Sequence, residues 1–143
     1  MTVRDILRAK GSNEVYTISP DATIATLLDN LNNLNVGAIV VLDDDGQSIA
    51  GIASERDLVR KLQGVPNPLH AQVRQIMSTD IYVCALDDST GSLMETMTER
   101  RVRHIPVIDD GKLVGLVSIG DAVKFRMGQL EFERDQLTNY VTG

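Results

Sequence analysis

The sequence has few of the residues on which disulfide bonding, metal binding or base stacking depends. It contains no Trp, two Phe, three Tyr, two His and one Cys. Scarce aromatic side chains leave little surface on which nucleic-acid bases can stack. The formal net charge of −6 also disfavours contact with a phosphate backbone. We therefore expect no nucleic-acid partner.

The single cysteine, Cys84, excludes an internal disulfide bond and is typical of a reducing compartment. It stands among apolar residues in "YVCAL", which favours a small core side chain over a nucleophile. No apolar run approaches the roughly 20 residues of a membrane span. The opening residues, "MTVRDILRAKGSNE", have no apolar signal core. We expect a soluble, cytoplasmic protein without a membrane partner.

What the sequence does have is an internal repeat that covers nearly all of the chain. Residues 15–44 align with residues 81–110, so that Tyr16 matches Tyr82. Further on, "GIASERDLV" at 51–59 matches "GLVSIGDAV" at 115–123. We call the shared pattern Gly-x-x-Ser-x-x-Asp the repeated frame.

The repeat also extends upstream of these blocks. The segment "VRDIL" at 3–7 matches "VRQIM" at 73–77, and we call these two stretches the leading segments. Hydrophobic residues make up 43% of the chain, which is enough for a real core. A unit of about 50 to 60 residues has much surface for its volume, so the two copies should pack on each other.

Each copy predicts the same series of elements: a short leading helix, a short strand, a helix, an apolar strand, a turn rich in Asp and Gly, a third strand and a second helix. The short strands are expected at 15–18 and 81–84, and residues 121–141 can form one long helix. The fold class is therefore α/β (α+β), with two β-α-β-β-α repeats packed about a pseudo-twofold axis into one compact module. The expected divisions are repeat 1 at 1–64, a linker at 65–72 and repeat 2 at 73–143.

The repeated frame has two readings. A Ser followed three residues later by an acid at a helix start is a capping box, which is purely structural. The same geometry suits a ligand, because a carboxylate accepts hydrogen bonds from neighbouring hydroxyls such as those of ribose. A glycine three residues before the Ser allows a ligand or another chain segment to approach the strand closely.

A phosphate needs cations, since it is repelled by the frame's Asp. Arg103 and His104 stand just before Ile105 and Pro106 in "RRVRHIPVID", and Arg56 lies inside "SERD". Alternatively, Arg103 belongs to a solvated surface run, and His104 is a core histidine. Pro106 removes a hydrogen-bond donor from its strand, so it marks an edge, a bulge or a place where something other than a strand lies alongside.

These motifs resemble a tandem pair of CBS domains, also called a Bateman module. The resemblance rests on "GIASERDLV", "GLVSIGDAV", "VRHIPVIDDGKLVGLVS" and the leading segments, and it covers almost the full chain. It implies a non-catalytic regulatory module that binds adenosine-containing ligands in clefts between the repeats. AMP comes first among these ligands, with ADP, ATP, NAD(H) or S-adenosylmethionine as alternatives. It also implies a homodimer, and an effector protein as a further partner.

By the same resemblance, Asp57 and Asp121 hold riboses, while Ser54 and Ser118 contact sugar or phosphate. The remaining positions carried over line the base and phosphate pockets or flank them. They are Thr17, Ile18, Gly37, Ala38, Ile39, Arg56, Val83, Cys84, Arg103, His104, Ile105, Pro106 and Gly120.

The copies differ on the phosphate side, because the first has Gly37 and Ala38 where the second has Arg103 and His104. We therefore expect two unequal sites. An enzyme is disfavoured by the lack of a Gly-rich phosphate loop or a metal-ligand cluster. The run Asp43–Asp45 reads as a solvated turn rather than a metal site. An assembly scaffold that binds no small molecule remains the alternative function.

Overall fold

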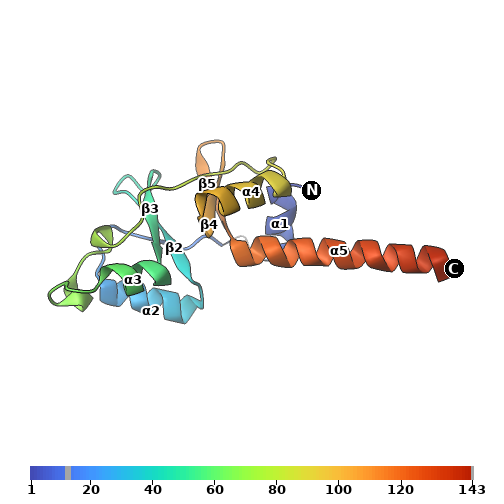
Figure 1. Ribbon diagram of the computed structural model, residues 1–143. Helices are drawn as coiled ribbons and strands as arrows, with labels where there is room; N and C mark the ends of the chain where they lie inside the picture. Colours follow the sequence, from blue (N-terminus) through green and yellow to red (C-terminus); the bar gives the residue numbers. More distant parts are fainter. Residues whose placement is uncertain (12–13, 143) are drawn as a thin grey trace. The chain divides into compact units, whose positions relative to one another are not determined.

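The computed structural model describes residues 1–11 and 14–142, and it forms a mixed α/β fold with small sheets (Figure 1). The chain divides into two compact units. Unit 1 contains the described residues of 1–13, 83–110 and 114–143. Unit 2 contains residues 14–82 together with 111–113.

Unit 2 holds the first repeat's hairpin and its two helices. Its elements are β1 (Thr17–Ile18), α2 (Ile24–Leu34), β2 (Ala38–Leu42), β3 (Ile49–Ser54), α3 (Glu55–Lys61) and the 3₁₀ turns η1 (Pro68–His70) and η2 (Val73–Gln75). The sheet order is β1-β2-β3, with β1 parallel and β3 antiparallel to β2. Strand β2 is apolar without alternation because both of its faces are covered: Ile39 and Val41 pack in the unit's core, and Val40 is also fully buried.

Unit 1 repeats this plan around a two-stranded sheet. Its elements are α1 (Val3–Lys10), α4 (Thr90–Arg100), β4 (His104–Asp109), β5 (Lys112–Ser118), whose first two residues are grouped with unit 2, and α5 (Ile119–Thr142). The core lies among α1, α4 and the hairpin, with Ile6, Leu93, Ile105 and Val117 almost completely buried. The predicted long helix at 121–141 is one continuous helix through Gly128.

The short strand predicted at 81–84 is wrong, because only a single parallel bridge forms there, between Cys84 and Val107. In the first repeat, the equivalent parallel pairing includes two residue pairs: Thr17 with Val40, and Ile18 with Val41. Pro106 takes the place of Val40 and has no N–H to donate. Its carbonyl still accepts from the Cys84 N–H at 3.0 Å, but the pairing cannot continue toward Tyr82. The proline thus explains why the pairing stops at one bridge and no strand forms at 81–84.

Each leading segment packs on the core of the other repeat. Val3 and Ile6 belong to the core of the second repeat, and Val73 and Ile76 to the core of the first. The 73–77 segment was predicted as a helix, but it forms only the 3₁₀ turn η2, whereas α1 is a full α-helix.

The backbone contacts of the two leading segments match bond for bond. The N–H of Val3 donates to the carbonyl of Asp88 at 2.9 Å, and that of Val73 donates to Ala22 at 2.8 Å. Next to these bonds, Arg4 pairs with Asp87, and Arg74 pairs with Asp21. The packing units therefore exchange their leading segments relative to the sequence repeats. The divisions at 64 and 73 mark where the sequence repeats end and begin. As boundaries between structural domains they stay a prediction.

Among the described helices, none is both long and apolar enough to cross a bilayer.

Candidate functional site

The frame at the start of α3 forms the capping box that its spacing predicts. Ser54 is the N-cap, and its hydroxyl accepts from the N–H of Asp57 at 3.2 Å. In return, Oδ2 of Asp57 accepts from the Ser54 N–H at 3.0 Å and from its hydroxyl at 2.9 Å. The structural reading of this frame is thus correct, and any ligand role is additional.

The second carboxylate oxygen of Asp57 faces two further groups. Oδ1 accepts from the Ser78 hydroxyl at 2.9 Å and lies 3.2 Å from Nζ of Lys61. The residue is only 7% exposed, and it is the only buried charged residue in the described chain. A buried carboxylate is costly unless its oxygens are satisfied, so these contacts are what make its burial tolerable.

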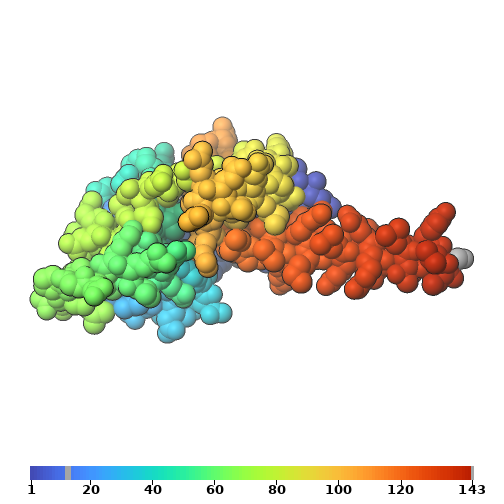
Figure 2. All heavy atoms as spheres, in the orientation of Figure 1, coloured from blue at the N-terminus to red at the C-terminus, as the bar shows by residue number. Residues whose placement is uncertain are grey.

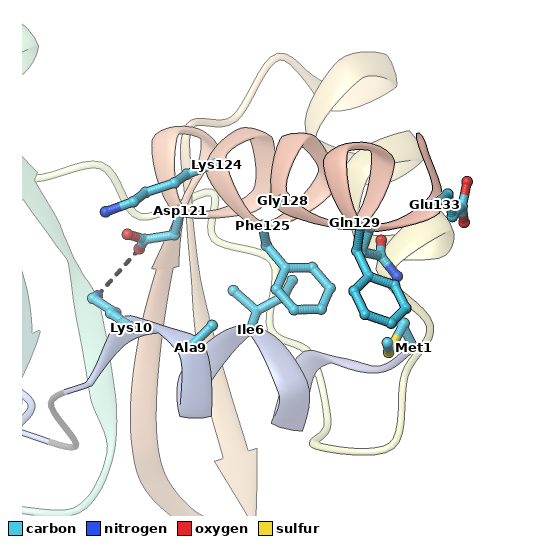
Figure 3. A pocket seen from close by; sticks show the side chains of 11 residues that line it. Met1, Ile6, Ala9, Lys10, Asp121, Lys124, Phe125, Gly128, Gln129 and Glu133 are labelled. Carbon is cyan, nitrogen blue, oxygen red and sulfur yellow. Dashed lines mark ion pairs between the residues drawn. The ribbon is translucent and has the colours of Figure 1, made fainter. Parts of the chain in front are cut away.

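The frame at the start of α5 repeats this arrangement with a different cation. The Ser118 N–H donates to Oδ2 of Asp121 at 2.9 Å, and the Asp121 N–H donates to the Ser118 hydroxyl at 3.0 Å. Nζ of Lys10, from α1, lies 3.2 Å from the same carboxylate and donates to the Leu116 carbonyl at 2.8 Å (Figure 3). Partial burial alone would raise the pKa of Asp121, but the Ser118 hydrogen bonds and Lys10 outweigh it and lower that pKa.

The glycine of each frame makes room for a leading segment or for the residue directly after it. A Cβ at Gly51 would stand 2.5 Å from the Ser78 carbonyl oxygen. A Cβ at Gly115 would stand 2.9 Å from the methyl groups of Leu7. The close approach inferred from sequence is therefore present, and another part of the same chain makes it.

The residue just before β2 or β4 accepts a hydrogen bond from the first residue of the helix that follows the frame's Ser. The N–H of Glu55 donates to the Gly37 carbonyl at 3.0 Å, and that of Ile119 donates to the Arg103 carbonyl at 2.8 Å. Ala38 pairs with Ser54 across the β2–β3 ladder. We call the place where Gly37 meets the helix that carries Asp57 the first corner. The second corner is the equivalent place, where Arg103 meets the helix that carries Asp121.

The other predicted site residues divide by exposure. Ile18, Ile39 and Ile105 are at most 8% exposed and pack in the cores, so only their backbones can face a ligand. Pro106 and Ala38 are buried as well, and His104 and Gly37 are half-buried. The exposed ones are Thr17, Arg56, Val83, Arg103 and Gly120.

Cys84 is partly buried beside β4, and its burial, helped by the charge of Asp88, raises the pKa of its thiol to about 12. A thiol so reluctant to ionise is a poor nucleophile, which agrees with its reading as a packing residue.

A cavity of about 700 Å³ lies in unit 1 between α1 and α5 (Figure 3). Ile6, Phe125 and Phe132 give it an apolar lining, while Lys10 and Asp121 stand at one end. Among the described residues that line it, Asp121 alone belongs to the predicted site. The cavity therefore meets the second corner at the Asp121 carboxylate and the Lys10 ammonium that holds it.

Sequence reasoning missed the groups that hold the two carboxylates, namely Lys10, Lys61 and Ser78. Lys61 was detectable, because it follows Asp57 by one helical turn. Lys10 and Ser78 were not, since Lys10 ends the helix that begins with one leading segment and Ser78 directly follows the other, and each leading segment packs on the other repeat.

The CBS domain family model matches residues 3–64 and 73–128, so the chain belongs to the CBS domain family, with two copies of the domain. The mitochondrial CBS domain-containing protein CBSX3 of Arabidopsis thaliana is 33% identical over 99% of this chain and 72% of its own.

Solved structures show the same tandem fold. The CBS-domain containing protein ATU1752 from Agrobacterium tumefaciens is 40% identical, with a TM-score of 0.80 over 87% of this chain and 92% of its own. The CBS domain protein PAE2072 from Pyrobaculum aerophilum, solved in complex with AMP, is 25% identical. Its TM-score is 0.74 over 85% of this chain and 89% of its own.

Proposed function

We propose that this protein is a non-catalytic regulatory module that binds an adenosine-containing ligand, AMP first among them, at its two corners. The observation that carries the proposal is the repeated carboxylate: Asp57 and Asp121 each follow a β-hairpin, each sits in the first turn of a helix, and each is held by a lysine. The AMP complex of PAE2072, within the same family, supports the choice of ligand.

Ribose binding requires an exchange of partners at each carboxylate. One oxygen of Asp57 is committed to the capping box, whereas the other contacts only Lys61 and Ser78 among the contacts described above. The 2′ and 3′ hydroxyls of a ribose offer the same type of hydrogen-bond donor. In the second corner, the ligand would compete with Lys10. The displaced lysine is then a cation close to the bound sugar.

The base and phosphate would contact the segments beside each carboxylate. We assign the base to the short strand Thr17–Ile18 in the first repeat and to the equivalent segment Val83–Cys84 in the second. We assign the phosphate to the segments that begin at Gly37 and Arg103. Ser54, Ser118, Arg56 and Gly120 border the same corners. ADP, ATP and NAD(H) share the adenosine part and remain candidates.

A thermal-shift panel tests the proposal, with AMP, ADP, ATP, NAD, NADH and GTP as probes. A ligand at about 100 times its dissociation constant stabilises the folded state by roughly 2.7 kcal/mol. We expect the adenine nucleotides to raise the melting temperature and GTP to do so less. Asp57→Ala and Asp121→Ala should each reduce the shift, measured against the variant's own ligand-free melting temperature.

The matched control is Asp5→Ala. Asp5 closes a capping box at α1, where its Oδ2 accepts from the Thr2 N–H at 2.9 Å, and the proposal gives it no ligand. It should lose stability like the other two variants but keep the full nucleotide response. If all three variants respond fully, the ribose assignment is wrong. If no nucleotide shifts the native protein, the module is an assembly scaffold instead.

A regulatory module must pass its signal to another chain, and we propose a second copy or an effector protein as the recipient. We also keep the cytoplasm as the proposed location, to be tested by cell fractionation.

A further inference from the structure

The C-terminal helix α5 has a stripe along one side that is apolar except for one arginine, Arg134. Its members follow one another at alternating steps of four and three residues, which is the spacing of a coiled-coil seam. We call them the α5 seam: Val123, Met127, Leu130, Arg134, Leu137 and Val141. Its apolar members are 42% to 80% exposed.

The seam faces away from the rest of unit 1. The residues of α5 that line the cavity over α1 include Asp121, Phe125, Gly128 and Phe132, which lie on the opposite side of the helix from the seam. Figure 3 shows Phe125 and the Gly128 position on the side of α1. The seam therefore adds nothing to the core described above.

The second half of α5 lacks the packing that normally stabilises a helix. Every described residue from 130 to 142 is exposed, and Ala122 is the only buried residue of the helix. Figure 2 shows the red C-terminal half extending past the α1 and α4 segments of unit 1. A helix in a protein owes most of its stability to an apolar face packed on a partner, and Gly128 costs this one about 1 kcal/mol more. The helix would therefore gain stability if a partner covered the seam.

The charges beside the seam are arranged for self-pairing. In heptad terms, Lys124 and Glu131 flank it on one side, and Arg126 and Glu133 on the other. Each side thus carries one cation and one acid, seven residues apart. Two antiparallel copies centred between Gly128 and Gln129 would bring Arg126 beside the second copy's Glu133. The same pairing brings Lys124 beside its Glu131.

Other ways of pairing two α5 helices bring like charges together. An antiparallel pairing shifted by one heptad places Glu131 and Glu133 beside their own copies, and the opposite shift does the same to Lys124 and Arg126. A parallel pairing stacks Arg134 on Arg134 in the seam. Exposed ion pairs are weak, so they select the register, while burial of the apolar seam supplies the affinity.

We propose that α5 is the self-association surface of this protein, where two copies pair antiparallel about a twofold axis between Gly128 and Gln129. Met127 then packs on Leu130 of the second copy at the centre. Arg134 lies over Val123 of the second copy, with its aliphatic stem on the apolar surface and its guanidinium in water. Leu137 reaches the start of the second copy's α5, near Ile119, which is itself 41% exposed. The proposal does not depend on nucleotide binding.

Sedimentation equilibrium on the full chain, at about 1 to 100 µM, tests for the dimer and its strength. We expect the native protein to dimerise and Leu130→Asp to dissociate it. The substitution occurs twice in a symmetric dimer, so the dissociation constant should rise at least about 100-fold. Phe132→Asp is the matched control, because it places the same charge on the other side of the same helix.

A charge exchange tests the orientation. Arg126→Glu should weaken the dimer, and adding Glu133→Arg should restore it, because the two residues meet across the antiparallel pair. In a parallel pair Arg126 would meet Glu131 of the second copy, and Glu133→Arg would restore nothing.

Three results would overturn the proposal: a native monomer over the whole range, a dimer that survives Leu130→Asp, or a dimer equally lost with Phe132→Asp. Failure of the charge exchange would overturn the antiparallel arrangement. The melting temperature of each variant shows whether it is folded. The nucleotide thermal shift, which uses other residues, should persist in Leu130→Asp.

Discussion

Gly51 and Gly115 occupy the same position in the two repeats, but they face different kinds of atom. At Gly51 the close neighbour is a backbone oxygen, that of Ser78, which is held by two hydrogen bonds between Ser78 and Ile52. At Gly115 it is the end of the Leu7 side chain. A backbone atom tied into a ladder cannot move away, whereas a leucine side chain can rotate.

This difference predicts unequal effects of one substitution. Gly51→Ala should lower the free energy of unfolding by about 1 to 3 kcal/mol, because the new methyl group overpacks a fixed contact. Gly115→Ala should cost less than about 1 kcal/mol, since Leu7 can adjust and alanine is otherwise better than glycine in a strand. Urea unfolding of both variants measures this. Equal losses would mean that the strand at Gly51 can shift to release the contact.

At the scale of elements, the sequence pattern predicted the helices and the long strands, because their apolar periodicity reports local burial. It did not predict which core receives each leading segment. Val3 and Val73 occupy equivalent positions in the pattern, and nothing in that pattern says that each joins the more distant repeat. Pro106 did carry a readable signal, since its missing N–H shortens the strand predicted at 81–84.

The exchange of leading segments predicts a crossed response to core truncation. Ile6 and Ile76 are each 1% exposed and belong to opposite cores. Ile6→Ala should cost about 2 to 5 kcal/mol and speed amide hydrogen exchange mainly in β4 and β5. Ile76→Ala should act mainly on β2 and β3. If amide hydrogen exchange in Ile6→Ala instead rises first in β2 and β3, which are closer in sequence, the assignment of the leading segments to opposite cores is wrong.

For the whole molecule, the candidate site was partly readable from the sequence. The Ser and Asp spacing predicted the caps correctly at both frames, because capping is a local interaction. Of the two cations at the carboxylates, only Lys61 was readable, since Lys10 reaches Asp121 from the end of α1, the helix that begins with the exchanged leading segment. The ligand roles of the surrounding residues stay predictions. The difference between Gly37 and Arg103 is therefore the strongest remaining clue to how the two corners differ.

This difference predicts two unequal sites for AMP. The second corner has Arg103 at its strand start and Lys10 at its carboxylate, whereas the first has Gly37 and Lys61. Calorimetric titration should show two affinities for AMP but more nearly equal ones for adenosine, which has no phosphate. A charged hydrogen bond is worth about 1.5 to 3 kcal/mol, so Arg103→Ala should weaken the tighter AMP site by about tenfold or more.

Arg101→Ala is the control for that titration, because Arg101 is an exposed arginine two residues away, at the C-cap of α4. If Arg103 is simply part of a solvated surface run, the two arginine variants should behave alike. If it holds the phosphate, only Arg103→Ala should lose AMP affinity, and adenosine binding should be unchanged in both. Two identical, independent AMP sites in the native protein would refute the asymmetry, because the shared carboxylates alone would then account for binding.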